Sequence, residues 1–272
     1  MKIKSITLIG ILLILSSCNH EIKKAPPNEI RMATTNKISA VKEISFYTPD
    51  GIQIFGDLYE SDKKGQTILL FHQGGSNARG EYASIIPNLV EKGYNILAID
   101  QRVGGQYYGS YNRTLANTPT HIYGDGYGYC DAYNNLESAL DFIIDSGFTG
   151  DKIIWGSSYS AALAIQLANN RQNDISGVLA FSPASGGSMK DCLADQYFAT
   201  LKIPLLILKP PSEMESENSK LQFDSANKYG HQTYVPKNGV HGSSMLVEKR
   251  VGNEVEDTWA VVLSFLNKIE IQ

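Results

Sequence analysis

Short apolar runs alternate with helix-like segments along most of this chain. Four of these runs are almost wholly apolar, TILLFH (67–72), YNILAID (94–100), SGVLAFS (176–182) and IPLLILK (203–209). Strands that are apolar on both faces are typical of a parallel sheet, because helices cover both of its faces. Helical segments between the strands supply the crossovers that parallel strands need. The alternation therefore predicts an α/β domain built on a mostly parallel sheet.

The remaining segments extend the same plan. Residues 41–48 and 52–60 flank Pro49-Asp50-Gly51, a turn signal that predicts an antiparallel hairpin at one edge of the sheet. Further strands are expected at 152–155 and 232–237. Helices are expected between and after the strands, over 81–92, 131–145, 159–169, 216–229 and 254–269. Pro87 limits or kinks the first of these helices, because proline lacks the N–H that a helix interior needs.

Composition restricts the classes of function. With 272 residues, of which 42% are hydrophobic, the chain can form one large domain with a sizeable core. With a net charge of −4, no overall basic field indicates nucleic-acid binding, so no nucleic-acid partner is expected. The sequence contains no HExxH, no CxxC and no phosphate-binding GxxxxGKS or GxxxxGKT, so neither a metal nor a cofactor is expected.

The N-terminal residues differ from the rest of the chain. Lys2 and Lys4 precede an apolar stretch at residues 6–15, and small residues follow it, which is the pattern of an export signal. The stretch is much shorter than the roughly 20 residues of a membrane-spanning helix, so a permanent transmembrane anchor is not expected. Residues 1–17 are therefore predicted to be a signal peptide.

The end of this signal, Leu15-Ser16-Ser17-Cys18, resembles a bacterial lipobox. The resemblance implies cleavage before Cys18, lipidation of its thiol, and an exported protein that is lipid-anchored to a membrane of the bacterial cell envelope. The alternative is an ordinary secretory signal with a chance cysteine. Residues 18–40 are polar and contain two prolines, so we expect a flexible tether between the lipid and a domain over 41–272.

Two further cysteines, Cys130 and Cys192, lie inside the expected domain. Export makes a disulfide between them possible. Two free, buried cysteines are the alternative, because unpaired cysteine is one of the most buried residue types. The sequence leaves both possibilities open.

The stretch Gly156-Ser157-Ser158-Tyr159-Ser160 stands between a predicted strand and a predicted helix. It matches the nucleophile elbow G-x-S-x-G, in which small residues on both sides of the serine let strand and helix approach closely. Ser158 takes the place of the nucleophile, and Ser160 replaces the second glycine. Ser157 does not fit, because Trp155 would stand where a small residue is needed. A polar strand-to-helix loop is the simpler alternative.

A serine hydroxyl needs a base, and in this arrangement the chain order is serine, acid, histidine. His231 and His241 are the histidines that follow Ser158. His241 lies in a glycine-flanked loop after the strand at 232–237 and before the last helix, where the base is expected. His231 precedes that strand and would lie at its opposite end. His241 is therefore the predicted base.

The acid is expected after the strand at 203–209, where the sequence reads KPPSEMES. Glu213 and Glu215 are the candidates. A carboxylate at this position would hold the imidazole in one tautomer and stabilise its protonated form. A solvated acidic loop is the alternative, and the residues by themselves leave both carboxylates open.

The anion that forms during acyl transfer needs backbone N–H donors. One is expected from the residue after the nucleophile, Tyr159, and the other from the loop that follows the strand at 67–72. Glycine permits close approach of the backbone, so Gly74 or its neighbour Gln73 is the expected second donor. His72 is then expected to brace the loop rather than to act as the base.

Taken together, LLFHQGGSNARGEY, AIDQRVGG, WGSSYSAA and GVHGSSM resemble the α/β-hydrolase superfamily, in particular its dienelactone-hydrolase-like or small carboxylesterase members. These motifs span residues 67–244 in the order that the family shows. The resemblance implies an eight-stranded, mostly parallel sheet with helices on both faces, and a triad of Ser158, Glu213 and His241. Related chains place the acid where Glu213 stands. This chain departs from the family pattern at Ser160 and at Pro210-Pro211.

Residues 101–130 contain many glycines and six tyrosines, at 107, 108, 111, 123, 127 and 129. They predict a long loop that either contacts substrate or packs its rings at the surface. The span between the strands at 176–182 and 203–209 is too short for a large lid, so an open site and a small or glycan-linked ester substrate are expected. Ester hydrolysis through an acyl-enzyme is the predicted reaction. A serine peptidase or amidase, and a binding lipoprotein without catalysis, are the alternatives.

Overall fold

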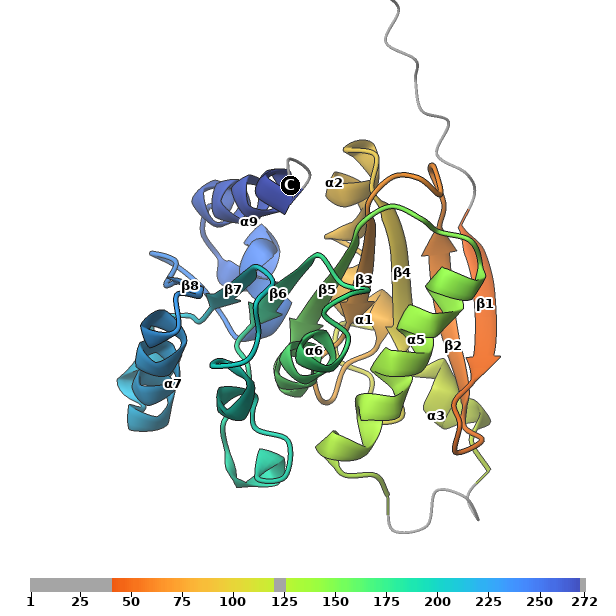
Figure 1. The fold of residues 1–272 in the computed structure, drawn as a ribbon, viewed down its shortest axis with the longest axis horizontal. Coiled ribbons are helices and arrows are strands. Elements are labelled where there is room, and N and C mark those ends of the chain that lie inside the picture. The colour runs from red at the N-terminus through yellow and green to blue at the C-terminus, as the bar shows by residue number, and fades with distance from the viewer. Residues whose placement is uncertain (1–40, 120–125, 270–272) are drawn as a thin grey trace, which may run out of the picture. The chain divides into compact units, whose positions relative to one another are not determined.

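The computed structural model describes residues 41–119 and 126–269. Eight strands form one sheet in the order β1-β2-β4-β3-β5-β6-β7-β8, with β1 and β8 at its two ends (Figure 1). β1 pairs with β2, and β2 with β4, in antiparallel orientation, whereas every pair from β4 to β8 is parallel. The mostly parallel sheet with an antiparallel hairpin at one edge is therefore confirmed.

The elements have these bounds. The strands are β1 (Lys42–Tyr47), β2 (Gln53–Tyr59), β3 (Thr67–Phe71), β4 (Asn95–Asp100), β5 (Lys152–Ser157), β6 (Gly177–Phe181), β7 (Leu205–Leu208) and β8 (Gln232–Tyr234). The α-helices are α1 (Ala78–Tyr82), α2 (Ile86–Glu91), α3 (Arg113–Asn117), α5 (Tyr133–Asp145), α6 (Tyr159–Asn170), α7 (Glu217–Lys228), α8 (Glu248–Val251) and α9 (Glu256–Ile269). The 3₁₀ helices are η1 (Tyr129–Ala132), η2 (Gly187–Met189), η3 (Ala194–Tyr197), η4 (Glu213–Glu215) and η5 (Gly242–Leu246).

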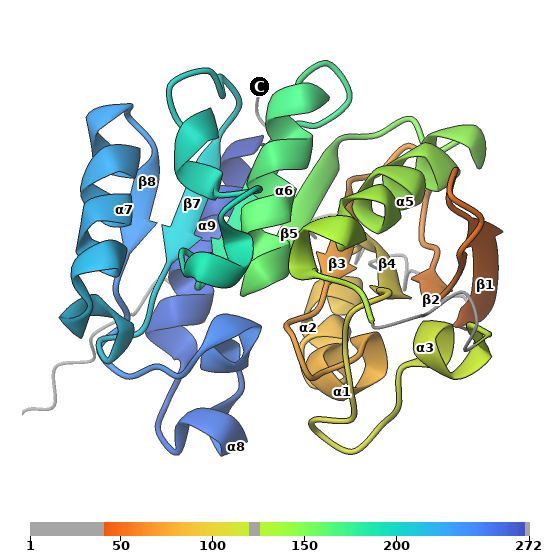
Figure 2. The same ribbon diagram turned by 90° about the horizontal axis from the view of Figure 1, so that it is seen from below.

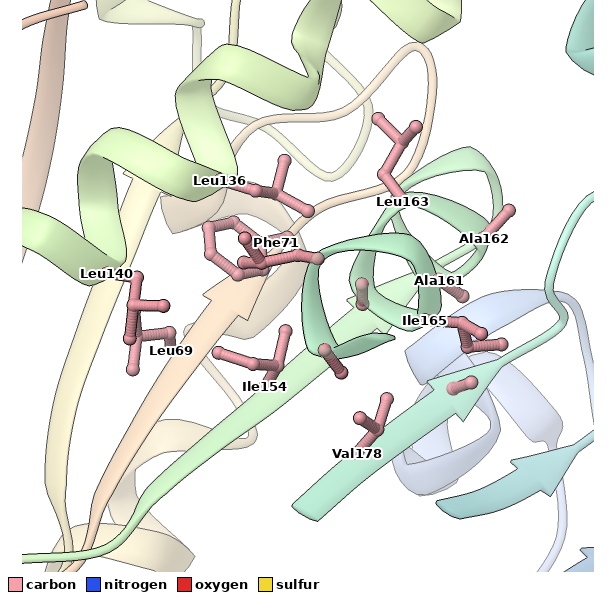
Figure 3. Close-up of a cluster of buried hydrophobic side chains, with 14 of the residues drawn as sticks. Leu69, Phe71, Leu136, Leu140, Ile154, Ala161, Ala162, Leu163, Ile165 and Val178 are labelled. Atoms are coloured by element: carbon pink, nitrogen blue, oxygen red, sulfur yellow. The ribbon is translucent and has the colours of Figure 1, made fainter. Parts of the chain in front are cut away.

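Helices cover both faces of the sheet (Figures 1 and 2), and alternate side chains of each strand face opposite layers. On β3, Leu69 and Phe71 belong to an apolar cluster with residues of α5, α6 and α7. Ile68 and Leu70 of the same strand belong to a second cluster, with residues of α1, α2 and α9. Figure 3 shows part of the first cluster, where side chains of α5 and α6 lie over those of β3 and β5. The central strands are apolar throughout because both of their faces are buried.

Two segments differ from the prediction. The helix expected over 81–92 is instead two short helices, α1 and α2. Pro87 lies in the first turn of α2, where its missing N–H breaks no helical hydrogen bond, so it helps to begin a helix. The loop expected over 101–130 contains α3 and the first two residues of η1. Asn112 caps α3 by accepting a hydrogen bond from the Leu115 N–H, a local signal that a glycine-rich surrounding conceals.

The predicted signal peptide, the lipidated Cys18 and the tether fall on residues 1–40 and lie outside the described residues. Among residues 41–119 and 126–269, no helix has the length and apolar character needed to cross a membrane.

Cys130 and Cys192 form a disulfide, with their Cα atoms 5.8 Å apart. It joins η1, which precedes α5, to the segment between β6 and β7. That segment covers 182–204 and contains the short helices η2 and η3, so no large lid is inserted there. Of the two possibilities for these cysteines, the structure has the disulfide.

The carboxyl ends of the parallel strands lie at one edge of the sheet. Polar residues follow directly after these ends, with His72 after β3, Ser158 after β5, Ser182 after β6 and Lys209 after β7. In open α/β sheets ligands bind outside this edge. The fold thereby places all the predicted functional loops on the same side.

Candidate active site

Ser158 occupies a strained turn between β5 and α6. Its φ of 62° and ψ of −122° lie in a region that residues other than glycine rarely adopt. Its N–H donates to the Phe181 carbonyl at 2.8 Å, which ties the turn to the end of β6. A Cβ at Gly156 would lie 2.5 Å from the Ala161 Cα, so the close approach of strand and helix requires glycine there. Ser158 is half-buried, and this geometry is that of a nucleophile elbow.

Ser160, which replaces the second glycine of the elbow pattern, does more than leave room. It is fully buried, and its hydroxyl donates to the His72 carbonyl at the end of β3. Gln101 donates its side-chain Nε2 to the same hydroxyl at 2.9 Å. The Ser160 side chain therefore joins the elbow helix to the loop that follows β3, a contact that glycine could not make.

The loop that carries His241 is fastened to the elbow. Ser243 N–H donates to the Ser157 hydroxyl at 3.0 Å, and the Trp155 indole donates to the Ser243 hydroxyl at 2.9 Å. Gly242 N–H donates to the hydroxyl of Ser182 at 3.0 Å. The two residues after His241 are thus bonded to the residue before Ser158 and to the end of β6.

Glu213 is the acid that meets His241. The His241 Nδ1–H donates to Glu213 Oε1 at 2.6 Å, and the His241 side chain is 48% exposed. Glu215, the other candidate acid, is exposed and makes no ion pair or hydrogen bond with another described side chain. The structure therefore brings together one of the two candidate carboxylates and the histidine.

Lys209 stands behind Glu213. Its Nζ lies 3.9 Å from Glu213 Oε2 and donates to the Pro183 carbonyl at 3.0 Å and to the Ser219 hydroxyl at 3.3 Å. Burial lowers the pKa of Lys209, while the Glu213 carboxylate opposes that shift. Lys209 therefore places a buried amine directly behind the acid.

Hydrogen bonds in the loop after β3 determine which backbone N–H is available to face an anion. His72 Nδ1–H donates to the Gln73 carbonyl at 2.9 Å, and its Nε2 accepts the Gln101 N–H at 3.0 Å. Burial lowers the pKa of His72, which fits this neutral tautomer. His72 is completely buried, so it braces the loop. The Gln73 N–H donates to Glu81 Oε2 at 2.7 Å and is therefore already used, whereas the Gly74 N–H donates to no described residue.

Tyr159 offers the second backbone donor. It is the first residue of α6, and the first N–H groups of a helix have no partner within it. Its own ring is buried and stacks on Tyr129, with the ring centroids 4.7 Å apart. The Tyr129 hydroxyl packs against Gly74, because a Cβ on that glycine would lie 2.9 Å from it. Tyr129 thus contacts both candidate donor residues.

Two tyrosines of the glycine-rich segment 101–130 contact the loop after β3 and the loop of His241. The Tyr107 ring packs on Gly75, where a Cβ would lie 2.7 Å from the ring. The Tyr108 hydroxyl accepts a hydrogen bond from Ser244, beside the His241 loop, at 3.0 Å. Tyr107 and Tyr108 remain 63% and 47% exposed, so these rings form an aromatic surface beside the candidate site.

The described residues contain no group of three or more His, Cys, Asp or Glu side chains arranged to hold a metal ion. Sequence reasoning had missed two polar residues of this region, Glu81 and Lys209. Both are charged residues at positions that turn out to be buried, and a single sequence gives no signal of that burial.

Comparison with known proteins identifies the fold of this chain. A scan against protein-family models matches none, and a search of curated proteins finds no match. Solved structures do match. An esterase from Pyrococcus furiosus is 18% identical over 84% of this chain and 91% of its own, with a TM-score of 0.62. The chain has the α/β-hydrolase fold.

Two further solved structures share this likeness. Est1E from Butyrivibrio proteoclasticus, solved with ferulic acid bound, is 12% identical over 84% of this chain and 100% of its own, with a TM-score of 0.63. An acylaminoacyl peptidase from Pyrococcus horikoshii is 13% identical, with a TM-score of 0.60, and the match covers 85% of this chain but 41% of the peptidase. In this chain the turn between β5 and α6 holds Ser158.

Proposed function

We propose that the protein is a serine hydrolase that cleaves esters through a triad of Ser158, His241 and Glu213. The observation that carries the proposal is the 2.6 Å hydrogen bond between His241 Nδ1 and Glu213 Oε1, in a loop whose next residues are bonded to the elbow of Ser158. A carboxylate on Nδ1 leaves Nε2 as the basic nitrogen, which is the tautomer that a general base requires.

The reaction follows from these positions. Ser158 Oγ attacks the ester carbonyl while His241 Nε2 takes its proton, and the backbone N–H groups of Gly74 and Tyr159 stabilise the oxyanion. His241 then protonates the leaving alcohol as the tetrahedral intermediate collapses to an acyl-enzyme. Water, deprotonated by the same nitrogen, releases the acid. Of the two donors expected from the β3 loop, Gly74 is preferred, because Gln73 already donates to Glu81.

The Ser158 hydroxyl makes no hydrogen bond to His241 or to any other described residue. Catalytic hydrogen bonds of this kind are often long before substrate binds and shorten in the complex. The proposal therefore requires the imidazole or the serine side chain to move before the proton is transferred.

A small or glycan-linked ester is the proposed substrate. The short segment between β6 and β7 leaves the site open, which suits a substrate that stays in contact with water. The exposed rings of Tyr107 and Tyr108 offer stacking surfaces for a sugar or an aromatic acyl group. The ferulic acid bound to Est1E supports an aromatic acid as one group to test.

We also propose that the protein is exported and held by a lipid on Cys18 to a membrane of the bacterial cell envelope. The basic start, the short apolar stretch and the lipobox-like end of the signal support this. The disulfide between Cys130 and Cys192 agrees with it, because disulfides persist in oxidising compartments outside the cytosol.

A fluorophosphonate probe tests the nucleophile. The purified protein is expected to be labelled at Ser158, and Ser158→Ala is expected to abolish labelling. Ser138→Ala is the control, because it removes a serine hydroxyl of α5 that bonds no other described residue and leaves the proposed nucleophile and the His241 loop in place. Absence of labelling in the unmodified protein would instead indicate a binding protein that keeps the fold without catalysis.

A substrate panel separates ester from amide cleavage. We expect hydrolysis of p-nitrophenyl acetate, of longer p-nitrophenyl esters with decreasing rate, and of acetylated or feruloylated sugars. The second candidate, a peptidase or amidase, is supported by the likeness to the acylaminoacyl peptidase. Clear cleavage of N-acetylated peptides together with no release of acetyl or aryl groups from esters would favour it.

A further inference from the structure

The carboxylate of Glu81 is buried beneath the candidate site. The proposed reaction gives this side chain no role. The side chain is inaccessible to solvent, in α1 directly after the loop that holds Gly74. Burial raises the pKa of Glu81, while the neighbouring Ser157 hydroxyl and the Gln73 N–H oppose that shift. A buried carboxyl group is destabilising unless polar partners compensate it, so its position calls for an explanation.

The two oxygens of Glu81 face two different loops. Oε2 accepts the Gln73 N–H at 2.7 Å, in the loop after β3. Oε1 has no hydrogen-bond partner among the described residues and faces the histidine loop, because a Cβ on Gly242 would lie 3.6 Å from it. The side chain therefore lies between the loop of the proposed oxyanion donor and the loop of the proposed base.

Hydrogen bonds hold the residues around Glu81 in place. Asn77 caps α1 by accepting the Gly80 N–H at 2.7 Å. Arg250 of α8 donates to the Gly80 and Glu81 carbonyls at 2.7 and 2.9 Å. The Tyr82 hydroxyl donates to the Phe71 carbonyl, the last residue of β3, at 2.7 Å. These hydrogen bonds give the carboxylate a fixed position relative to the loop after β3.

The hydrogen bond from Gln73 fixes the direction of the next peptide. The Gln73 carbonyl is held separately, by His72 Nδ1–H at 2.9 Å and by the Ser76 N–H at 3.2 Å. With both its N–H and its carbonyl bonded, Gln73 has little freedom in φ or ψ. In a trans peptide the N–H points opposite to the carbonyl, so the Gly74 N–H is turned away from His72 and left without a partner.

We propose that Glu81 is a positioning residue for catalysis: by accepting the Gln73 N–H, its carboxylate sets the orientation in which the Gly74 N–H meets the oxyanion. The inference rests on the proposed serine-hydrolase function. Glu81 touches neither substrate nor the reacting atoms, and it acts through the peptide that it holds. A donor fixed before the reaction costs no reorganisation when the charge develops, so a loosened donor lowers kcat more than it changes substrate binding.

Two variants separate this role from general support of the fold. Glu81→Leu keeps the volume but removes the acceptor, and is expected to lower kcat by about 10- to 1,000-fold with KM changed less than about threefold. Glu81→Gln keeps an acceptor oxygen and is expected to recover at least about tenfold of that loss. A trifluoromethyl ketone, whose adduct carries an oxyanion, should lose affinity in Glu81→Leu in proportion to kcat.

Asn95→Leu is the matched control. Asn95 is also fully buried, at the start of β4 on the opposite edge of the sheet, and its Oδ1 accepts the Ser61 and Asp62 N–H groups at 2.7 and 3.1 Å. Asn95→Leu also leaves buried backbone N–H groups without their acceptor. The variant is therefore expected to have a lower melting temperature, while the folded protein keeps its kcat.

If Glu81→Leu does not fold, Glu81→Asp takes its place. It withdraws the acceptor by about 1.5 Å, one bond length, and its kcat should fall below that of Glu81→Gln.

Fluorophosphonate labelling of the unmodified protein reports on the proposed function separately, because it needs the nucleophile and its base. If the unmodified protein labels, the inference about Glu81 is overturned by a folded Glu81→Leu with kcat within twofold of the parent. It is also overturned by equal losses in Glu81→Leu and Glu81→Gln, or by Asn95→Leu losing as much kcat as Glu81→Leu. If the unmodified protein does not label, the hydrolase function itself fails.

Discussion

Glu213 and His241 lie 28 residues apart in the sequence and are joined by a 2.6 Å hydrogen bond from the imidazole Nδ1 to the carboxylate. Glu213 begins η4, after β7, and His241 precedes η5, after β8. Neighbouring parallel strands bring these two loops to the same edge of the sheet. The pair fixes one tautomer of the histidine, and its catalytic value can be measured by changing the acid.

Glu213→Gln is expected to lower kcat by about 100- to 10,000-fold, because the amide cannot stabilise the imidazolium and can favour the wrong tautomer. KM for a p-nitrophenyl ester should change little. Steady-state kinetics on the folded variant, checked by circular dichroism, measures both. Glu215→Gln, two residues away and exposed, is the control and should keep the kcat of the parent. If the two variants lose activity equally, Glu213 is not the acid of the triad.

The sheet could be predicted from the sequence because its signals are redundant. Each central strand is a continuous apolar run, and both faces of β3 are buried as that run implies. The hairpin of β1 and β2 follows from Pro49-Asp50-Gly51 between two strand-like segments. The division of 81–92 into α1 and α2 was missed, because Pro87 is compatible both with a kink and with the first turn of a new helix.

The site could be predicted only in part, because part of it depends on long-range burial. Ser158 and His241 occupy positions that turn geometry and strand order dictate, so local sequence points to them. The choice between Glu213 and Glu215 depends on how η4 turns its side chains, which two nearby glutamates do not reveal. Glu81 reads as an ordinary glutamate of a short helix, and its burial arises from packing between the β3 loop and α8.

Ser160 provides a test of the departure from the G-x-S-x-G pattern. Ser160→Ala removes the hydroxyl that bonds the His72 carbonyl and Gln101, and leaves those buried groups without that partner. The free energy of unfolding should fall by about 1–3 kcal/mol, measured by urea denaturation. Ser138→Ala is the control, a serine of α5 whose hydroxyl bonds no other described residue. Ser160→Gly, which restores the usual pattern, should be at least as destabilising, because glycine also weakens the first turn of α6.

A stability gain of Ser160→Gly over the parent would contradict this account. It would mean that the hydroxyl is accommodated by the elbow without contributing to it. Ser160 would then be only a small residue in place of glycine.

The disulfide is expected to stabilise the folded protein. Cys130 and Cys192 are separated by 62 positions, and closing a loop of that size restricts the unfolded chain. The double variant Cys130→Ala/Cys192→Ala should lose about 2–4 kcal/mol of unfolding free energy. Adding dithiothreitol should lower the melting temperature of the parent and leave that of the double variant unchanged. A parent that is insensitive to complete reduction, verified by thiol counting, would show that the bond adds no stability.

The Asp57 carboxylate is expected to make the free energy of unfolding depend on pH in the acid range. It is buried in β2, and Arg113 Nη1 and Arg79 Nε lie 2.9 and 2.7 Å from its two oxygens. Burial by itself would raise the pKa of Asp57, but the hydrogen bonds from Arg79 and Arg113 outweigh it and the pKa is lowered. Because the pKa is lower in the folded than in the unfolded chain, the ionised carboxylate stabilises the fold above the unfolded pKa of about 3.9. That contribution is lost as the pH falls through the lower, folded pKa.

Asp57→Asn should therefore lower the free energy of unfolding by about 3–5 kcal/mol at pH 7, since it leaves the buried Arg113 without one of its carboxylates. The difference from the parent should shrink below about pH 4, where the parent loses the same contribution by protonation. Urea denaturation from pH 7 down to pH 3 measures both quantities. Glu217→Gln, an exposed carboxylate at the start of α7, should leave the curve of the parent unchanged. Parent and Asp57→Asn curves that stay parallel over the whole range would mean that the Asp57 carboxylate is not the acid-sensitive element of this fold.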